Sequence, residues 1–289
     1  MADYRNQYPF QSHYFDHAGV RMHYLDEGPN DAPVMVMVHG NPTWSFYYRH
    51  LVNAFSDRFR VVVPDHIGCG MSDKPQEYPY TLEQHMQNLE ALLKKLDVKD
   101  ITLVVHDWGG GIGFGYATRH PENVKRMVVF NTSAFFRPVL YWGIKVSRSP
   151  IIGDVLTRGL NSFLEGSFLI ATSQHKRFRG DVRDGYLAPY RNWHDRIAIL
   201  RFVQDIPMKA SHPTRKTVDE IEARLHLLKD VPKQFIWGVD DPVFTTDTFM
   251  AGFQEHFPDA NYHTLDNAGH YVVEDAHERI IPVMRQFLE

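Results

Sequence analysis

The chain has 289 residues, enough for one large α/β domain or for a core with a modest insertion. Hydrophobic residues make up 43% and charged residues 23%, as in soluble globular proteins, and the formal net charge of −4 gives no basic field favouring nucleic acid or an anionic membrane. The apolar runs are too short for a membrane span, Cys69 has no partner for an internal disulfide, and no apolar leader follows Met1, so a cytoplasmic protein is expected.

Short apolar runs alternate with amphipathic stretches along the chain, and this alternation predicts a mostly parallel, eight-stranded sheet flanked by helices. The predicted strands begin with a hairpin and continue as short buried runs: His13–Asp16, Val20–Asp26, Val34–Val38, Arg60–Val63, Ile101–Val105, Arg126–Phe130, Gln234–Trp237 and Asn261–Leu265. Apolar residues at helical spacing predict a helix over Leu82–Leu96. A helix of small residues that can pack close to the sheet is expected over Gly110–Arg119, and a closing helix over Glu278–Leu288.

The β–α rhythm is interrupted between about Phe135 and Pro213, where aromatic and helix-forming residues dominate and strand signals are weak. A helical insertion here would lie over the carboxyl edge of the sheet, where open α/β folds bind their ligands. We therefore predict three parts, an α/β core over 1–134 and 213–289 and a helical cap over 135–212. Ordinary core helices are the alternative.

The turn after the strand predicted at 101–105 carries the strongest local signal. The run Val104–Gly110 leads from a buried strand into a sharp turn and then into small residues that open a helix. This layout is typical of a nucleophile elbow, in which one side chain stands exposed at the top of the sheet. The residue at the elbow is Asp107, whose alternative role is to cap the helix that follows.

Further site residues follow other predicted strands in the chain order of α/β hydrolases, which is nucleophile, acid, histidine. The run His39–Pro42 stands where such folds place the loop that supplies an oxyanion donor. His270, after the last strand, stands in the position of the general base. Asp241 is the predicted acid, because the spacing Trp-Gly-x-x-Asp-Pro favours it over its competitor Asp240. The loop after the strand predicted at 126–130 offers only Asn131, which carries no charge.

An aspartate at the elbow indicates displacement at saturated carbon, because a carboxylate attacking such a carbon forms an alkyl ester. Asp107 is already ionised at neutral pH, so His270 is expected to activate the water that hydrolyses the ester. Two hydrogen-bond donors beside the nucleophile, the Asn41 amide and the Trp108 indole, are expected to hold the departing anion. The sequence contains no cluster of metal-ligating residues, so neither a metal ion nor an organic cofactor is expected.

The chain resembles the haloalkane dehalogenases in the runs His39–Ser45, Val63–Asp73 and His106–Gly110. The resemblance covers essentially the whole chain and includes a helical cap. It implies a catalytic triad and a halide-binding pair, which carry over as Asp107, His270 and Asp241, and as Asn41 and Trp108. The acid after the penultimate strand and the use of Asn41 resemble the third dehalogenase subfamily, which is itself similar to the β-lactone decarboxylases of bacterial olefin biosynthesis.

The first hypothesis is a haloalkane dehalogenase (EC 3.8.1.5), which releases an alcohol and a halide ion through an ester on Asp107. The alternative is a β-lactone decarboxylase for long-chain lactones, since both reactions need an ionised nucleophile and a cradle for an anion. An epoxide hydrolase, with donors such as Tyr141, Tyr186 or Tyr190, and a non-enzymatic binding module are less favoured. In every enzymatic case the partner is a small hydrophobic substrate, and a homo-oligomer is left open.

Overall fold

The computed structural model describes residues 4–289, and within them the strands form one eight-stranded sheet in the order β1-β2-β4-β3-β5-β6-β7-β8. The pairs β1–β2 and β2–β4 are antiparallel, and all the other neighbours are parallel. The predicted mostly parallel sheet is confirmed, and each predicted strand is present. The strands are β1 (His13–His17), β2 (Val20–Glu27), β3 (Val34–Val38), β4 (Arg60–Pro64), β5 (Ile101–Asp107), β6 (Val124–Thr132), β7 (Lys233–Gly238) and β8 (Asn261–Leu265).

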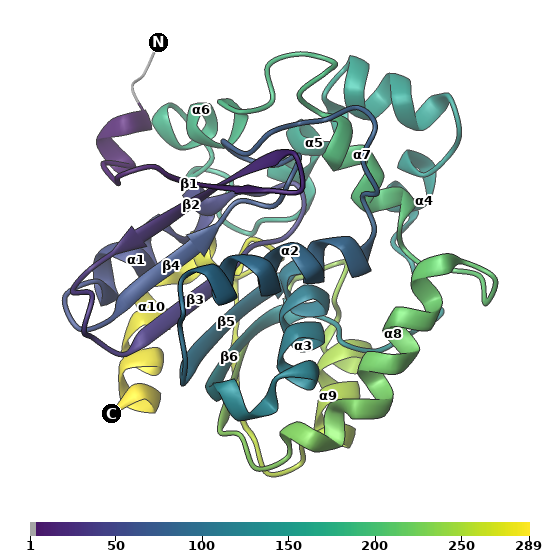
Figure 1. The fold of residues 1–289 in the computed structure, drawn as a ribbon. Helices are drawn as coiled ribbons and strands as arrows, with labels where there is room; N and C mark the ends of the chain where they lie inside the picture. The colour runs from purple at the N-terminus through teal and green to yellow at the C-terminus, as the bar shows by residue number, and fades with distance from the viewer. Residues whose placement is uncertain (1–3) are drawn as a thin grey trace.

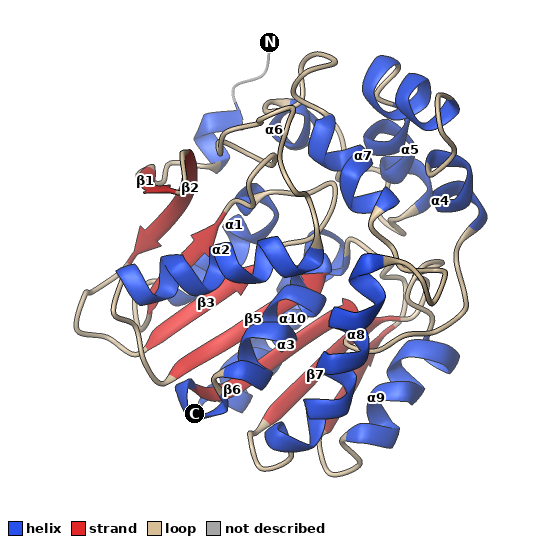
Figure 2. Cartoon of the chain, turned by 45° about the vertical axis from the view of Figure 1, so that its right-hand side comes forward, coloured by secondary structure: helices blue, strands red, loops and turns tan. Residues whose placement is uncertain are grey.

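Helices cover both faces of the sheet, as Figure 2 shows. One face carries α2 (Leu82–Lys95), α3 (Trp108–Arg119), α8 (Pro213–Arg224) and α9 (Ala251–His256), and the other carries α1 (Arg49–Phe55) and α10 (Val272–Leu288). Alternate residues of β3 enter the two cores, because successive side chains of a strand point to opposite faces. Val36 and Val38 pack into the core under α2 and α3, and Met35 and Met37 into the core under α1 and α10.

Two helices begin earlier than predicted. The helix α3 begins at Trp108 rather than Gly110, because β5 extends to Asp107 and the turn between them is tight. The helix α10 begins at Val272 rather than Glu278, and its first turn is separated from the rest by a kink at Ala276, whose φ and ψ are not helical. That first turn lies directly beside the predicted site, so its early start matters for function.

The segment predicted as a cap contains no strand and lies beyond the ends of β3, β5 and β6 (Figure 1). Its helices are α4 (Trp142–Ser147), α5 (Ser162–Ile170), α6 (Asp181–Leu187) and α7 (Ile197–Gln204), with a π-helical turn over Asp154–Gly159. A hydrogen bond to a buried ion pair of the core fastens this segment. Arg49 of α1 donates two hydrogen bonds to Glu274 of α10, and Tyr186 of α6 donates a third to the same carboxylate.

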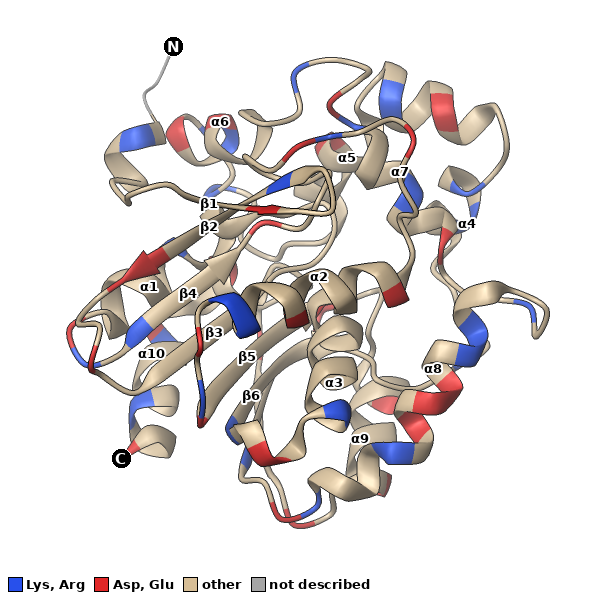
Figure 3. Ribbon diagram, viewed as in Figure 1, with Lys and Arg blue, Asp and Glu red and all other residues tan. Residues whose placement is uncertain are grey.

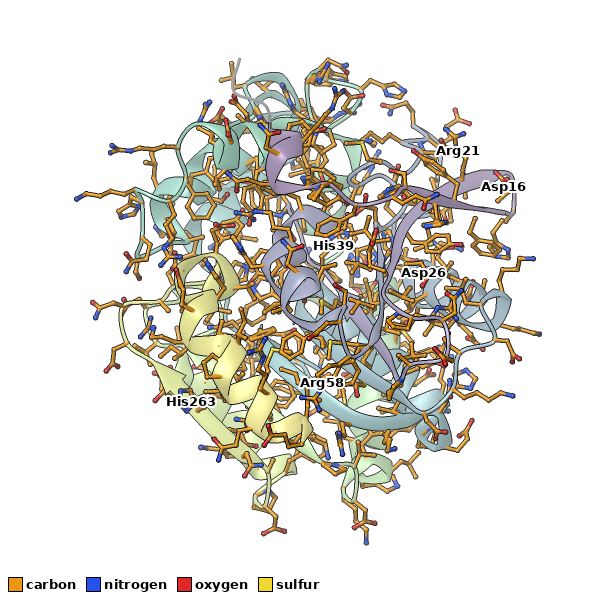
Figure 4. All side chains as sticks on the ribbon, turned by 90° about the vertical axis from the view of Figure 1, so that its left-hand side faces the viewer. Asp16, Arg21, Asp26, His39, Arg58 and His263 are labelled. Carbon is orange, nitrogen blue, oxygen red and sulfur yellow. The ribbon has the colours of Figure 1, made fainter. Side chains whose placement is uncertain are left out.

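The hairpin β1–β2 lies at one edge of the sheet. Figure 4 shows Asp16 and Arg21 beside the hairpin turn at the margin of the molecule, whereas His39, which follows β3, lies in its interior. The His39 side chain is fully buried, and its Nδ1 is 2.8 Å from the Gly40 carbonyl oxygen. The loop after β3 is therefore a packed part of the core that can hold a site in place.

Candidate active site

Asp107 occupies the turn between β5 and α3 with a φ of 52°, in the left-handed region that residues with a Cβ rarely adopt. Such a strained conformation persists only where the surroundings enforce it, and it is common at functional sites. Glycines make the turn possible: a Cβ at Gly40 would overlap the Asp107 side chain, and one at Gly109 would overlap the Val38 carbonyl. The predicted elbow is present, with its side chain at the carboxyl edge of the sheet.

Two backbone N–H groups contact the Asp107 carboxylate. The Asn41 N–H donates to Oδ1 at 2.6 Å, and the Trp108 N–H, at the first position of α3, also hydrogen-bonds the carboxylate. Burial raises the pKa of Asp107, and these two donors and His270 oppose that effect. The Asn41 N–H, with the Trp108 N–H beside it, would stabilise negative charge at Oδ1 if the carboxylate became an ester and its carbonyl were attacked.

His270 lies between the two aspartates. Its Nδ1 is 2.9 Å from Oδ2 of Asp241, and its Nε2 is 3.6 Å from Oδ2 of Asp107. Burial disfavours the imidazolium, but the charges of Asp241 and Asp107 outweigh burial and raise the pKa of His270. The other oxygen of Asp241 accepts the N–H groups of Val243 and Phe244, which fix the carboxylate. The three residues thus have the geometry of a nucleophile, a proton carrier and an orienting acid.

Asp240 and Asn131 lie outside this arrangement. Asp240 is exposed and accepts a hydrogen bond from Ser173. Asn131 is buried, and its amide exchanges two hydrogen bonds with the backbone of Gly238. Asn131 therefore links β6 to β7. The acid that contacts His270 is Asp241, the residue after Asp240.

Both predicted anion donors border the same cavity as Asp107 and His270. One N–H of the Asn41 amide donates to the Ile199 carbonyl at 3.1 Å, which orients the amide and leaves its second N–H free. Within residues 4–289 the Trp108 indole nitrogen has no hydrogen-bond partner, and its ring packs against Phe202. The two donors are thus held in place by α7 and remain available to an anion in the cavity.

The cavity has a volume of about 280 Å³ and extends from the elbow under the helices of the cap. Its wall is mostly apolar, and it includes Leu82, Phe135, Ile144, Phe163, Met208 and Phe244. An apolar pocket with a few convergent polar groups is the usual form of a site for a small hydrophobic molecule. Of the tyrosines considered above, Tyr141 borders this cavity, whereas Tyr186 and Tyr190 are buried and already donate to Glu274 and to the Thr43 carbonyl.

Two supporting residues were not identified from the sequence. His106, just before the elbow, is buried with its Nε2 2.8 Å from the carbonyl oxygen of His270, so it ties β5 to the loop that carries His270. Asp275, in the first turn of α10, accepts the Gly269 N–H at 2.8 Å and also hydrogen-bonds Thr172 and the Ser173 N–H. Both residues act through the backbone next to His270, and no local motif marks such contacts.

The described residues contain neither a metal site nor a membrane-spanning helix. No group of three or more His, Cys, Asp or Glu side chains within residues 4–289 is placed to hold a metal ion. No helix in this part of the chain is both long and apolar enough to cross a bilayer.

Comparison with known proteins gives relatives of this chain in sequence and in fold. A family model described as the α/β-hydrolase fold matches residues 33–276. A cis-3-alkyl-4-alkyloxetan-2-one decarboxylase of Shewanella oneidensis is 44% identical over 97% of this chain and 89% of that protein. Haloalkane dehalogenase 2 of Mycobacterium tuberculosis is 32% identical over 94% and 93%. The tetrameric structure of a haloalkane dehalogenase from Paraglaciecola agarilytica matches with a TM-score of 0.81 and 26% identity, covering 98% of this chain and 96% of that one.

Proposed function

The chain belongs to the α/β-hydrolase fold family, and from that premise we propose that it is a β-lactone decarboxylase, converting a cis-3,4-dialkyl-oxetan-2-one into an olefin and carbon dioxide. The observation that carries the proposal is the 44% identity to a protein of that name over 97% of the chain, against 32% for a haloalkane dehalogenase. This reverses the order favoured by the motifs alone, because the motifs are shared by both reactions. An apolar cavity suits a substrate with two alkyl chains.

In the first step Asp107 attacks the ring carbon C4 and displaces the ring oxygen. The C4–O1 bond breaks, an ester bond forms between C4 and Asp107, and the ring oxygen departs as part of a carboxylate that stays attached through C3. The free N–H of Asn41 and the Trp108 indole are the donors proposed to receive this carboxylate. Relief of ring strain favours the step, and neither water nor a cofactor is consumed.

In the second step the C2–C3 bond breaks and releases carbon dioxide, its electrons form the C3–C4 double bond, and the C4–O bond to Asp107 breaks. Asp107 regains its negative charge, so the enzyme returns to its starting state. The imidazolium of His270, 3.6 Å from Oδ2, stabilises the departing carboxylate, and Asp241 stabilises the imidazolium. Inversion at C4 followed by anti fragmentation converts a cis-lactone into a cis-olefin.

Isotope labelling in ¹⁸O-water tests this route against hydrolysis. A single turnover with a cis-3,4-dialkyl-oxetan-2-one should yield the cis-olefin and leave the Asp107 peptide without ¹⁸O, because fragmentation does not involve water. Hydrolysis of the ester at its carbonyl would instead leave one ¹⁸O in Asp107 and release a β-hydroxy acid. The Asp107→Ala variant is the control and should give neither product. A β-hydroxy acid from the wild-type enzyme would contradict the proposal.

Haloalkane dehalogenation is the second candidate, supported by the 32% identity and by the shared arrangement of nucleophile, histidine and anion donors. Here Asp107 would displace a halide, and His270 would then activate water against the resulting ester. Release of halide from a panel of bromoalkanes, with one ¹⁸O appearing in Asp107, would support it. The proposed domain limits of 1–134, 135–212 and 213–289 apply to either reaction, because the cavity lies between the cap and the core.

A further inference from the structure

Exposed apolar side chains are concentrated on the cap. Twelve large hydrophobic residues are exposed among residues 4–289, and ten of them lie between positions 139 and 193. We call these ten residues the cap patch: Val139, Trp142, Val146, Ile151, Ile152, Val155, Leu160, Leu169, Ile170 and Trp193. The other two, Tyr14 and Leu227, lie elsewhere on the core. Single exposed apolar residues are ordinary on a soluble protein, but a gathering of this size on one segment marks a binding surface.

The elements that carry the cap patch lie against one another. The π-helical turn Asp154–Gly159 packs against both α4 and α5, which places most of the patch on neighbouring elements. Trp193 joins them through Arg158, whose guanidinium lies 4.5 Å from the centre of the indole ring. Most of the cap patch therefore lies on elements that adjoin one another.

The cap differs from the core in charge as well. Residues 135–212 contain twelve Lys and Arg against six Asp and Glu, a formal charge of +6. Because the whole chain carries −4, the remaining residues carry −10. Basic residues occur along the cap from α4 to α7 (Figure 3), and Lys145, on α4 beside the patch, is exposed. The cap is thus basic although the net charge of the whole chain is negative.

We propose that the cap patch docks the protein onto an anionic lipid surface. Aliphatic and tryptophan side chains beside lysine and arginine are the combination that binds the boundary between lipid headgroups and acyl chains. Pairing of the patch with the same patch of a second copy is disfavoured, because it would bring two caps of charge +6 together. The proposal is independent of the reaction that the site performs.

The cavity opens beside this surface. Val139 and Ile170 belong to the cap patch and also line the cavity, so the patch and the cavity have these two residues in common. On a membrane, an apolar molecule dissolved in the lipid could enter the cavity without crossing water.

Vesicle flotation tests the proposal. The full-length protein should float with phosphatidylcholine vesicles that contain phosphatidylglycerol and much less with phosphatidylcholine alone, and added salt should weaken its binding. Changing Trp142, Ile151 and Leu169 to serine should reduce binding to the anionic vesicles by at least about tenfold, since burying one such side chain accounts for roughly that factor. Lys145→Glu should reduce binding severalfold.

Matched variants on the core serve as controls. Leu227→Ser removes an exposed leucine outside the cap, and Lys99→Glu reverses an exposed charge there; both should bind vesicles like the wild type. Three results would overturn the proposal: no flotation with anionic vesicles, equal loss in the Leu227→Ser control, or a triple variant that still floats but changes from oligomer to monomer in light scattering. The last result would assign the patch to self-association.

Discussion

Changing Asp241 to asparagine removes the negative charge beside His270 and keeps the shape of the side chain. The oxygen that accepts the Val243 and Phe244 N–H groups is retained, so the loop should keep its conformation. What is lost is the attraction between a carboxylate and an imidazolium that are both more than nine-tenths buried and 2.9 Å apart. Both charges are delocalised beyond these two atoms, and two unit charges about 4 Å apart interact by about 4 kcal/mol at an effective dielectric constant of about 20.

A loss of about 4 kcal/mol in stabilising the imidazolium corresponds to roughly a 10³-fold lower rate for the step that needs it. The assay is single-turnover olefin formation from a cis-3,4-dialkyl-oxetan-2-one, measured as a function of pH. If protonated His270 assists the fragmentation, the wild-type rate should fall as pH rises through the raised pKa of His270. In the Asp241→Asn variant this pKa is lower, so the fall should move to lower pH and the plateau should drop.

The matched control is Asp240→Asn, which changes an exposed neighbour that bonds Ser173 and does not contact His270. It should keep a rate within a few fold of the wild type. The reasoning would be refuted if Asp241→Asn stayed within tenfold of the wild type with an unshifted pH profile. It would also be refuted if Asp240→Asn were the more damaging change.

Three further predictions concern the anion donor, the buried ion pair and a buried acid. Trp108→Phe removes the indole N–H and keeps a ring, so ring opening should slow on the order of 10²-fold in stopped-flow assays, and an unchanged rate would assign Trp108 to packing. Arg49→Met leaves the Glu274 carboxylate buried without its cation, so urea titration should show about 3–5 kcal/mol less stability. Tyr186→Phe, which removes one hydrogen bond to Glu274, should cost about 1 kcal/mol, and equal losses in the two variants would contradict this ranking. Burial raises the pKa of Asp205 to about 6, above its unfolded value of about 3.9, so the stability it contributes at low pH should be lost as pH rises between these values. Asp205→Asn should flatten the pH dependence of unfolding in that range, and an unaltered slope would argue against this role.

The sheet and the elbow were predictable because their signals are local. A continuous apolar run such as Val34–Val38 indicates a buried strand whatever lies elsewhere in the chain, and the structure reproduces its bounds. The geometry around Asp107 also depends on the small residue Gly109 in the same motif, which lets the start of α3 approach the Val38 carbonyl at the end of β3. Asp241 and His270 each follow a predicted strand, so parallel pairing alone brings them to one edge of the sheet.

The supporting contacts were not predictable, because they join segments that are distant in sequence. Asp275 contacts the cap about a hundred residues earlier in the chain, and nothing in its own neighbourhood marks that pairing. His106 was included in the elbow motif, but its bond to the His270 carbonyl depends on how two loops pack. The choice of substrate also lies outside the motifs, because Asn41 and Trp108 suit a halide and a carboxylate equally.

The carboxylate of Asp275 links the cap to the loop that carries His270, so the positions of these two segments are coupled. One of its oxygens accepts both the Ser173 N–H from the cap and the Gly269 N–H beside His270. If the cap moves away from the core, the bond from the Ser173 N–H breaks. The Asp275 carboxylate is then less firmly oriented toward the Gly269 N–H. An open cap, the form most accessible to bulk water, would therefore also be the form in which His270 is least well positioned, so loading and catalysis would alternate rather than coincide.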